Sequence, residues 1–207
     1  IFEDAPLDQA VEGVIAGIYF NQGHVCCAGS RLLVQEGVFP QVIRKLRDRI
    51  ATLRVGNPLD KNTDIGAINS RMQLDKIHEL VDSGLQQGAE LVQSNCKLPA
   101  KGYWYPPSFF TGVTASHRIA QEEIFGPVLS VIRVKSAEEA FAVNNGVRYG
   151  LSSSLYTNDV NIAFRALQEL DHGIPYVNAP AIGSGALFPF CCVTETVTGP
   201  RRARCVV

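Results

Sequence analysis

The chain has 207 residues, of which 46% are hydrophobic, and a formal net charge of −1. This length is sufficient for one α/β domain with a substantial core. The near-neutral charge gives no support for a nucleic-acid partner or an anionic membrane surface, and no apolar run approaches the roughly 20 residues that cross a bilayer.

The six cysteines are too sparse for a disulfide scaffold, and no Cys-x-x-Cys pair occurs among them. We therefore expect reduced thiols and a cytoplasmic location. A zinc site formed by His24, Cys26 and Cys27 is not expected, because adjacent cysteines seldom chelate one metal and no second ligand pair follows. The sequence starts at Ile1 without a Met or a signal peptide, so we expect it to be the middle of a longer gene product.

Helical and strand patterns alternate along the chain. A first helix is expected after Asp4, a candidate N-cap, and its apolar residues recur at helical spacing as far as residues 21–23. Apolar periodicity predicts further helices over 38–53, 70–86, 136–146 and 159–171, the third with a start that resembles a capping box. Apolar and β-branched runs predict strands at 31–35, 89–93, 127–134, 151–156 and 174–177, and an extended, Pro-limited segment at 103–110.

This alternation of strands and helices predicts an α/β fold with a mostly parallel sheet that helices cover on both faces. Ligands of such sheets bind beyond the carboxyl ends of the strands. The loops that follow residues 134 and 177 are therefore candidate ligand-binding loops.

Residues 20–31, with the sequence FNQGHVCCAGSR, carry the candidate chemistry. Two adjacent cysteines lie between Gly23 and Gly29, which permit tight turns that other residues resist. A cysteine in such a loop can face a cleft, whereas a cysteine inside an element usually packs. Adjacent side chains diverge in an irregular segment, so both thiols are not expected to face one substrate. We predict that Cys26 is a nucleophile.

The pattern Asn-Gln-Gly-x-x-Cys-x-Ala-x-x-Arg resembles the nucleophile motif of the aldehyde dehydrogenase superfamily, and its flanks align the family's catalytic cysteine with Cys26. A second block, QEEIFGPV at 121–128, resembles the segment with which the family contacts its nicotinamide cofactor. Two long motifs in the family's order make the resemblance specific. It covers residues 1 to about 190 and corresponds to the catalytic domain alone.

The resemblance implies NAD(P)-dependent oxidation of an aldehyde to a carboxylic acid. The Cys26 thiolate would add to the carbonyl carbon, hydride would leave the thiohemiacetal for NAD or NADP, and water would hydrolyse the thioester. The backbone N–H of Cys26 is a candidate donor to the oxyanion. Glu123 is implied to accept hydrogen bonds from the nicotinamide ribose and Phe125 to pack beside the nicotinamide ring. Cys27 and Phe190 are implied to line the substrate pocket.

Three elements of the family have no counterpart in this sequence: the Rossmann-like cofactor domain, the oxyanion-hole asparagine and the general-base glutamate. We therefore expect a fragment that is not competent alone, and a homo-oligomer for the full-length protein. Asn178 is interpreted as a structural residue at a strand end. Cys191 and Cys192 replace the paired glycines of relatives, so we expect a catalytic domain over 1–190 and an atypical tail over 191–207.

Two other functions would use the same residues. In the first, Cys26 acts with a histidine such as His172 in a thiol hydrolase or esterase, which requires the thiol and the imidazole within hydrogen-bond reach. The second is a non-catalytic interaction module, which a buried, inaccessible Cys26 would favour. His24, where relatives commonly carry Gln, is interpreted as a residue that packs the loop and not as a base for Cys26.

Overall fold

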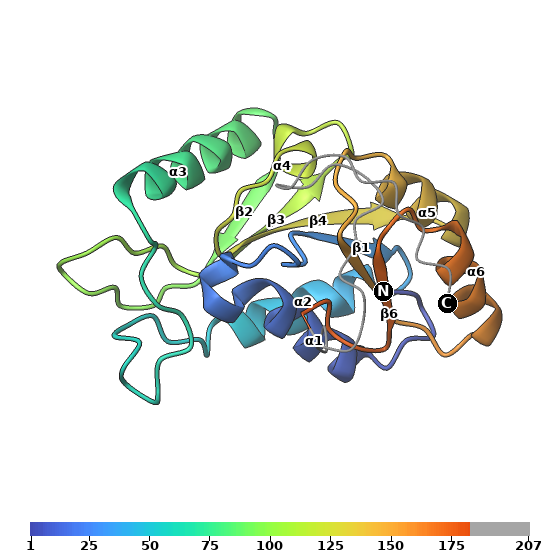
Figure 1. Ribbon diagram of the computed structural model, residues 1–207, viewed down its shortest axis with the longest axis horizontal. Coiled ribbons are helices and arrows are strands. Elements are labelled where there is room, and N and C mark those ends of the chain that lie inside the picture. The colour runs from blue at the N-terminus through green and yellow to red at the C-terminus, as the bar shows by residue number, and fades with distance from the viewer. Residues whose placement is uncertain (183–207) are drawn as a thin grey trace.

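The computed structural model describes residues 1–182, which form a four-stranded sheet and a smaller two-stranded sheet (Figure 1). The larger sheet has the strand order β1-β4-β3-β2. Its strands β1 and β3 pair in parallel with β4, and β2 pairs antiparallel with β3 at one edge. The smaller sheet pairs β5 and β6 in parallel. The strands are β1 (Arg31–Gln35), β2 (Glu90–Gln93), β3 (Ser108–Val113), β4 (Val128–Val134), β5 (Ser152–Leu155) and β6 (Ile174–Val177).

Helices cover both faces of the larger sheet, as the sequence predicts (Figure 1). Helices α1 and α2 lie on one face, α3 and α4 lie on the other, and α5 and α6 lie beside the two-stranded sheet. The helical elements are α1 (Leu7–Tyr19), a 3₁₀ turn η1 (Phe20–Gly23), α2 (Phe39–Ile50), α3 (Arg71–Gln86), α4 (Arg118–Gln121), α5 (Ala137–Asn145) and α6 (Val160–Glu169). No helix within residues 1–182 is both long and apolar enough to span a bilayer.

The central strand β4 is buried on both faces, and its alternate residues serve two cores. Leu129 and Val131 pack with α1 and α2, whereas Val128 and Ile132 pack with α3 and α4. Successive side chains of a strand point to opposite faces, so a strand covered on both sides reads as a continuous apolar run. Burial on both faces explains why the β4 residues form a nearly continuous apolar run in the sequence.

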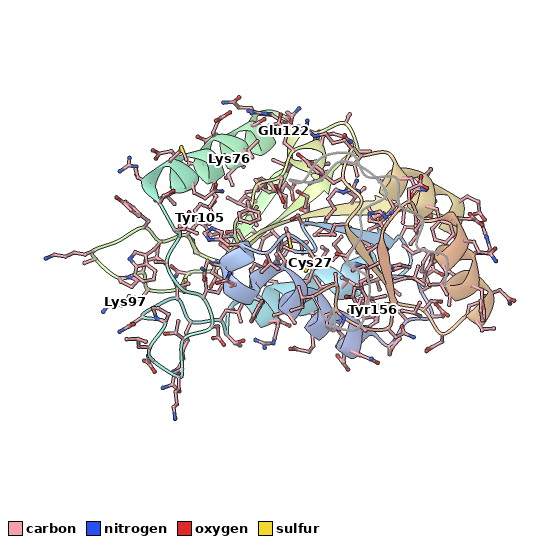
Figure 2. The ribbon with its side chains drawn as sticks, viewed as in Figure 1. Cys27, Lys76, Lys97, Tyr105, Glu122 and Tyr156 are labelled. Atoms are coloured by element: carbon pink, nitrogen blue, oxygen red, sulfur yellow. The ribbon has the colours of Figure 1, made fainter. Side chains whose placement is uncertain are left out.

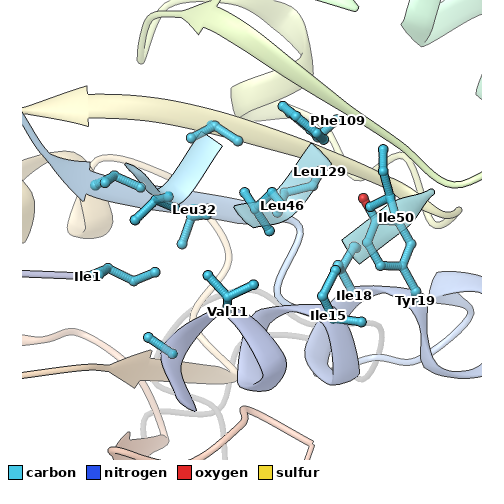
Figure 3. Close-up of a cluster of buried hydrophobic side chains, with 14 of the residues drawn as sticks. Ile1, Val11, Ile15, Ile18, Tyr19, Leu32, Leu46, Ile50, Phe109 and Leu129 are labelled. Atoms are coloured by element: carbon cyan, nitrogen blue, oxygen red, sulfur yellow. The ribbon is translucent and has the colours of Figure 1, made fainter. Parts of the chain in front are cut away.

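The core between α1, α2 and the sheet is the larger of these two clusters (Figure 3). Ile18 of α1, Leu46 and Ile50 of α2, and Phe109 and Leu129 of the sheet are at most 1% exposed. Burying such a side chain contributes about 1.5–3 kcal/mol relative to leaving it exposed. This packing fixes the end of α1, from which the chain passes directly into the cysteine-bearing loop.

The start of α1 differs from the prediction. Pro6 occupies the N-cap position, and no side chain caps the helix. The Asp4 carboxylate instead accepts hydrogen bonds from the Thr157 hydroxyl at 2.9 Å and the Asn158 backbone N–H at 2.7 Å. The proposed N-cap role of Asp4 is therefore wrong, because a tertiary partner that no local pattern reveals takes up the carboxylate.

The two sheets are joined through the first residues of the chain. The Ile1 ammonium group donates to the Leu33 carbonyl at 2.7 Å, and the Gln35 N–H donates to the Ile1 carbonyl at 3.0 Å. The Phe2 N–H donates to the Tyr156 carbonyl at 3.0 Å. Residues 1–2 thus lie between β1 and the end of β5, and the strands of residues 1–182 form two linked sheets where a single sheet was predicted.

Candidate active site

The loop over residues 20–31, here called the cysteine loop, leaves α1 in a strained conformation. Asn21 and Gln22 have φ angles of 49° and 48°, in the left-handed region that non-glycine residues rarely occupy. The Gln22 side chain accepts a hydrogen bond from the Gly66 N–H at 3.1 Å, and the Asn21 side chain donates to the His24 carbonyl at 3.0 Å. These bonds hold the backbone in a conformation that it would otherwise leave.

The cysteine loop lies against residues 121–128, here called the second segment. Gly23 has a φ of 76°, and a Cβ atom there would come within 2.2 Å of the Gly126 carbonyl oxygen. The His24 imidazole stacks on the Phe125 ring, with centroids 5.5 Å apart and an interplanar angle of 7°. The Gln73 side chain of α3 donates to the Ile124 and Phe125 carbonyls at 2.8 and 3.0 Å. The two sequence motifs therefore meet in space.

The two neighbouring thiols of the cysteine loop have different surroundings. Cys26 is exposed, whereas Cys27 is 8% exposed near the middle of the molecule (Figure 2). Burial, followed by the proximity of Cys26, raises the pKa of the Cys27 thiol. The thiolate is the nucleophilic form of cysteine, so burial disfavours Cys27 as a nucleophile. In residues 1–182 the backbone N–H of Cys26 donates no hydrogen bond and is free for an incoming oxygen.

The two adjacent glutamates of the second segment also differ. The Glu122 carboxylate accepts two hydrogen bonds from Arg118, at 2.7 and 3.0 Å, which lower its pKa. Arg118 also pairs with Glu79 at 2.7 Å. Glu123 is half-buried, and within residues 1–182 its carboxylate makes no hydrogen bond or ion pair. The i,i+4 spacing of Arg118 and Glu122 is a sequence signal that identifies Glu122 as the paired glutamate.

A cavity of about 330 Å³ is lined by the residues predicted for the site. Cys26, Cys27, Glu123 and Phe125 all face it, and it extends to the slot between the sheets where Ile1 and Phe2 lie. The structure thus brings Cys26, Glu123 and Phe125 to one cavity. Phe190 and the predicted tail over 191–207 lie outside the described residues, as does the boundary predicted at 190.

The edge of the sheet that carries the site differs from the expectation. The cysteine loop precedes β1 and the second segment precedes β4, so both lie at the amino ends of their strands. Because β1 and β4 pair in parallel, with Arg31 opposite Ser130, the segments that enter them meet at one edge.

The loop after 177 holds Asn178, whose side chain donates to the Thr157 carbonyl at 2.9 Å and accepts from the Thr157 N–H at 3.1 Å. Its structural role is confirmed.

His172 also faces the cavity, but its imidazole serves other partners. Its Nδ1 lies 3.1 Å from the Asn144 side-chain nitrogen, and in residues 1–182 no hydrogen bond joins it to Cys26. Burial, followed by the charge of Arg31, lowers the pKa of His172 to about 4. Arg31 itself donates to the Val143 and Asn144 carbonyls at the end of α5. The thiol–imidazole pair that a hydrolase requires is not formed.

Residues 1–182 contain no group of three or more His, Cys, Asp or Glu side chains that could hold a metal ion.

These features of residues 1–182 define a class of α/β protein in which an accessible thiol, a carboxylate without a partner among these residues and an aromatic ring line one cavity. A family model described as the aldehyde dehydrogenase family matches residues 1–205. The chain belongs to this family, which confirms the resemblance of its two motifs.

Individual relatives agree with this assignment. Aldehyde dehydrogenases of Emericella nidulans and Aspergillus niger are 38% and 39% identical over 178 and 179 residues, in each case 86% of this chain and 36% of theirs. The NAD-dependent aldehyde dehydrogenase of Sinorhizobium meliloti matches with a TM-score of 0.88 and 37% identity over 93% of this chain and 39% of its own. Betaine aldehyde dehydrogenase of Staphylococcus aureus in complex with NAD⁺ matches with a TM-score of 0.86 and 32% identity over 91% of this chain and 38% of its own. This chain therefore spans little more than a third of the length of these relatives.

Proposed function

We propose that this chain is the thiol-bearing catalytic part of an NAD(P)-dependent aldehyde dehydrogenase, which oxidises an aldehyde to a carboxylic acid. One observation carries the proposal: Cys26, Glu123 and Phe125 line a single cavity although they come from motifs far apart in the sequence. Relatives named as NAD-dependent aldehyde dehydrogenases support the same reaction. Because the chain covers only part of these relatives, competence for turnover is proposed for the full-length protein.

In the proposed reaction the Cys26 sulfur attacks the aldehyde carbon and forms a thiohemiacetal. The free N–H of Cys26 donates to the oxygen, which carries negative charge as the tetrahedral species forms. A bound nicotinamide cofactor supplies the hydride acceptor. Once hydride has left the former carbonyl carbon, Cys26 holds the acyl group as a thioester, and water releases the carboxylic acid.

The residues of the second segment suit a nicotinamide nucleoside. The Glu123 carboxylate, which has no partner among residues 1–182, can accept hydrogen bonds from both hydroxyls of a ribose. The Phe125 ring offers a flat apolar face to a flat heterocycle at little entropic cost. NAD and NADP share this half of their structure, so the proposal covers both cofactors.

Two alternatives are weaker. A thiol hydrolase would need an imidazole hydrogen-bonded to Cys26, and the imidazole of His172, which lines the cavity, is hydrogen-bonded to Asn144. A non-catalytic module would be favoured by a sealed thiol, and Cys26 is exposed. The two observations count against these alternatives.

One experiment with two readouts tests the proposal. The chain is treated with iodoacetamide near neutral pH, and its cysteine peptides are quantified by mass spectrometry. We expect Cys26 to react about tenfold or more faster than Cys27, because burial raises the pKa of the Cys27 thiol. Slow and equal labelling of Cys26, Cys27 and Cys96 would contradict the assignment of the nucleophile.

The second readout is NAD⁺ binding by the full-length protein, measured by saturation-transfer NMR on the nicotinamide and ribose protons. We expect Glu123→Gln to weaken binding about tenfold, in line with the loss of a hydrogen bond to a charged acceptor. The matched control is Glu122→Gln, which changes the neighbouring carboxylate but removes only the pair with Arg118. Equal effects of the two variants, or no transfer to the nicotinamide protons, would count against the proposal.

A further inference from the structure

We infer that His24 is a positioning residue, whose imidazole holds the Phe125 ring in place beside the Cys26 thiol by stacking on it. The inference rests on the proposed function for what the Phe125 ring does, namely to pack beside the nicotinamide. The stacking itself is independent of any cofactor. Through it, one residue of the cysteine loop orients a residue of the second segment.

The contact between His24 and Phe125 is a parallel stack of their two rings. The two rings lie 7° from parallel with centroids 5.5 Å apart. The Nε2 atom of His24 is buried and has no hydrogen-bond partner in residues 1–182, whereas the face of the ring stacks on Phe125. Burial lowers the pKa of His24, which keeps the imidazole neutral near pH 7 and suited to stacking on an aromatic face.

The backbones on both sides of the stack are held independently. The His24 N–H donates to the Asn21 carbonyl at 2.9 Å, within the strained turn that leaves α1. Phe125 has a φ of 53°, which is unusual for an aromatic residue, and Gln73 binds its carbonyl. With both backbones fixed and Gly23 against Gly126, the stack is what sets the side-chain orientation of Phe125.

The same geometry explains why His24 does not act as a base for Cys26. A general base needs a nitrogen within hydrogen-bond reach of the proton that it removes. In residues 1–182 no hydrogen bond joins either ring nitrogen of His24 to Cys26, and the ring stacks on Phe125. A flat ring at this position therefore matters for its shape, which a glutamine would lack.

Hydrogen exchange followed by mass spectrometry tests the inference on the chain as it stands. We expect His24→Ala to speed amide exchange about fivefold both in the cysteine loop and in residues 121–128, because loss of a stacking contact frees both partners. His24→Phe keeps a flat ring and removes the unpartnered nitrogen, so it should retain wild-type exchange in both segments. Coupling is reciprocal, so Phe125→Leu should speed exchange in the cysteine loop.

The controls separate stacking from general loss of stability. His78→Ala removes another ring contact, the edge-on pair of His78 with Tyr105, and should leave both segments unchanged. If His24→Ala prevents folding, His24→Gln, which keeps the size and polarity but not the ring, takes its place with the same expectation. Faster exchange confined to the cysteine loop, or a His24→Phe variant that behaves like His24→Ala, would overturn the inference. No nucleotide is used, so failure to bind NAD⁺ would contradict the proposed function and not this result.

Discussion

Neighbouring residues of one type acquire different properties from their surroundings at this site. Cys26 and Cys27 differ in exposure, and Glu122 and Glu123 differ in whether a cation pairs with them. The motif resemblance selects Cys26 and Glu123 from these pairs, and the geometry gives the physical reason for the selection. Spacing distinguishes the two glutamates, because Arg118 lies four positions before Glu122, whereas composition and spacing do not distinguish the two cysteines.

His172 gives the site a pH dependence of stability whose direction follows from its pKa. The folded-state value of about 4 lies below the unfolded value near 6.5, because burial and Arg31 disfavour the imidazolium. Between these values the unfolded chain binds more protons, so stability is complete above about pH 6.5 and falls as the pH drops towards 4. The full effect amounts to about 3 kcal/mol.

Urea unfolding of the wild type and of His172→Gln at pH 7 and pH 4.5 measures this dependence. The wild type should lose more stability than the variant over this interval, because glutamine has no proton to gain. His78→Gln, at an exposed position on α3, is the matched control and should follow the wild type. Equal losses in all three proteins would show that other groups govern acid unfolding.

Most elements could be predicted from the sequence because their patterns are long and local. The continuous apolar run of β4 and the Ser136 start of α5 are examples, and the Ser136 hydroxyl does accept the Glu139 N–H at 3.3 Å. Helix α4 was missed because four residues carry no period. The antiparallel edge strand β2 and the division into two sheets depend on pairing between distant segments, which has no local signature.

In the candidate site, too, local sequence patterns could be predicted and contacts between distant segments could not. The cysteine motif and the second segment could be identified as sequence, yet their contact could not. The hydrogen bond from Gly66 to Gln22 and the stack of His24 on Phe125 span 44 and 101 positions, and neither has a spacing that marks it. The left-handed φ of Gln22 is accompanied by the hydrogen bond from Gly66, a tertiary contact that the residue type does not reveal.

Two glycines of α1 provide a prediction at the scale of this helix. A Cβ atom at Gly13 would lie 1.9 Å from the Tyr156 hydroxyl oxygen, and Tyr156 is only 3% exposed. A Cβ at Gly17 would meet no atom within 4 Å. Alanine is favoured over glycine inside a helix by about 0.5–1 kcal/mol. Gly17→Ala should therefore stabilise the chain by up to about that amount.

Gly13→Ala should instead destabilise the chain by about 1–3 kcal/mol, because overpacking against a buried ring outweighs the gain in helix propensity. Urea unfolding monitored by circular dichroism measures both free energies on the same helix. A stabilising Gly13→Ala would mean that the Tyr156 ring moves aside freely, and α1 would then not be fixed against the residue that follows β5.

At the scale of the whole molecule, the site exists because packing on both faces of one sheet brings two loops to the same edge. Helix α1 on one face ends in the cysteine loop, and α3 on the other face holds the second segment through Gln73. The parallel pairing of β1 with β4 places the two entry segments side by side. Gly23 packs against Gly126 so tightly that no Cβ atom would fit between them.

Substitution of the buried Gly23 should therefore disrupt the site. Gly23→Ala places a Cβ atom 2.2 Å from the Gly126 oxygen and forces alanine into a φ of 76°, for a cost of about 3 kcal/mol in unfolding free energy. Gly29→Ala, in the same loop, meets no atom within 4 Å and should change stability by less than about 0.5 kcal/mol. Loss of the contact should also expose Cys27, so its alkylation rate should rise in Gly23→Ala and not in Gly29→Ala. If both variants unfold and react like the wild type, the two motifs are not held together by this approach, and the cavity that carries the proposed function loses its physical basis.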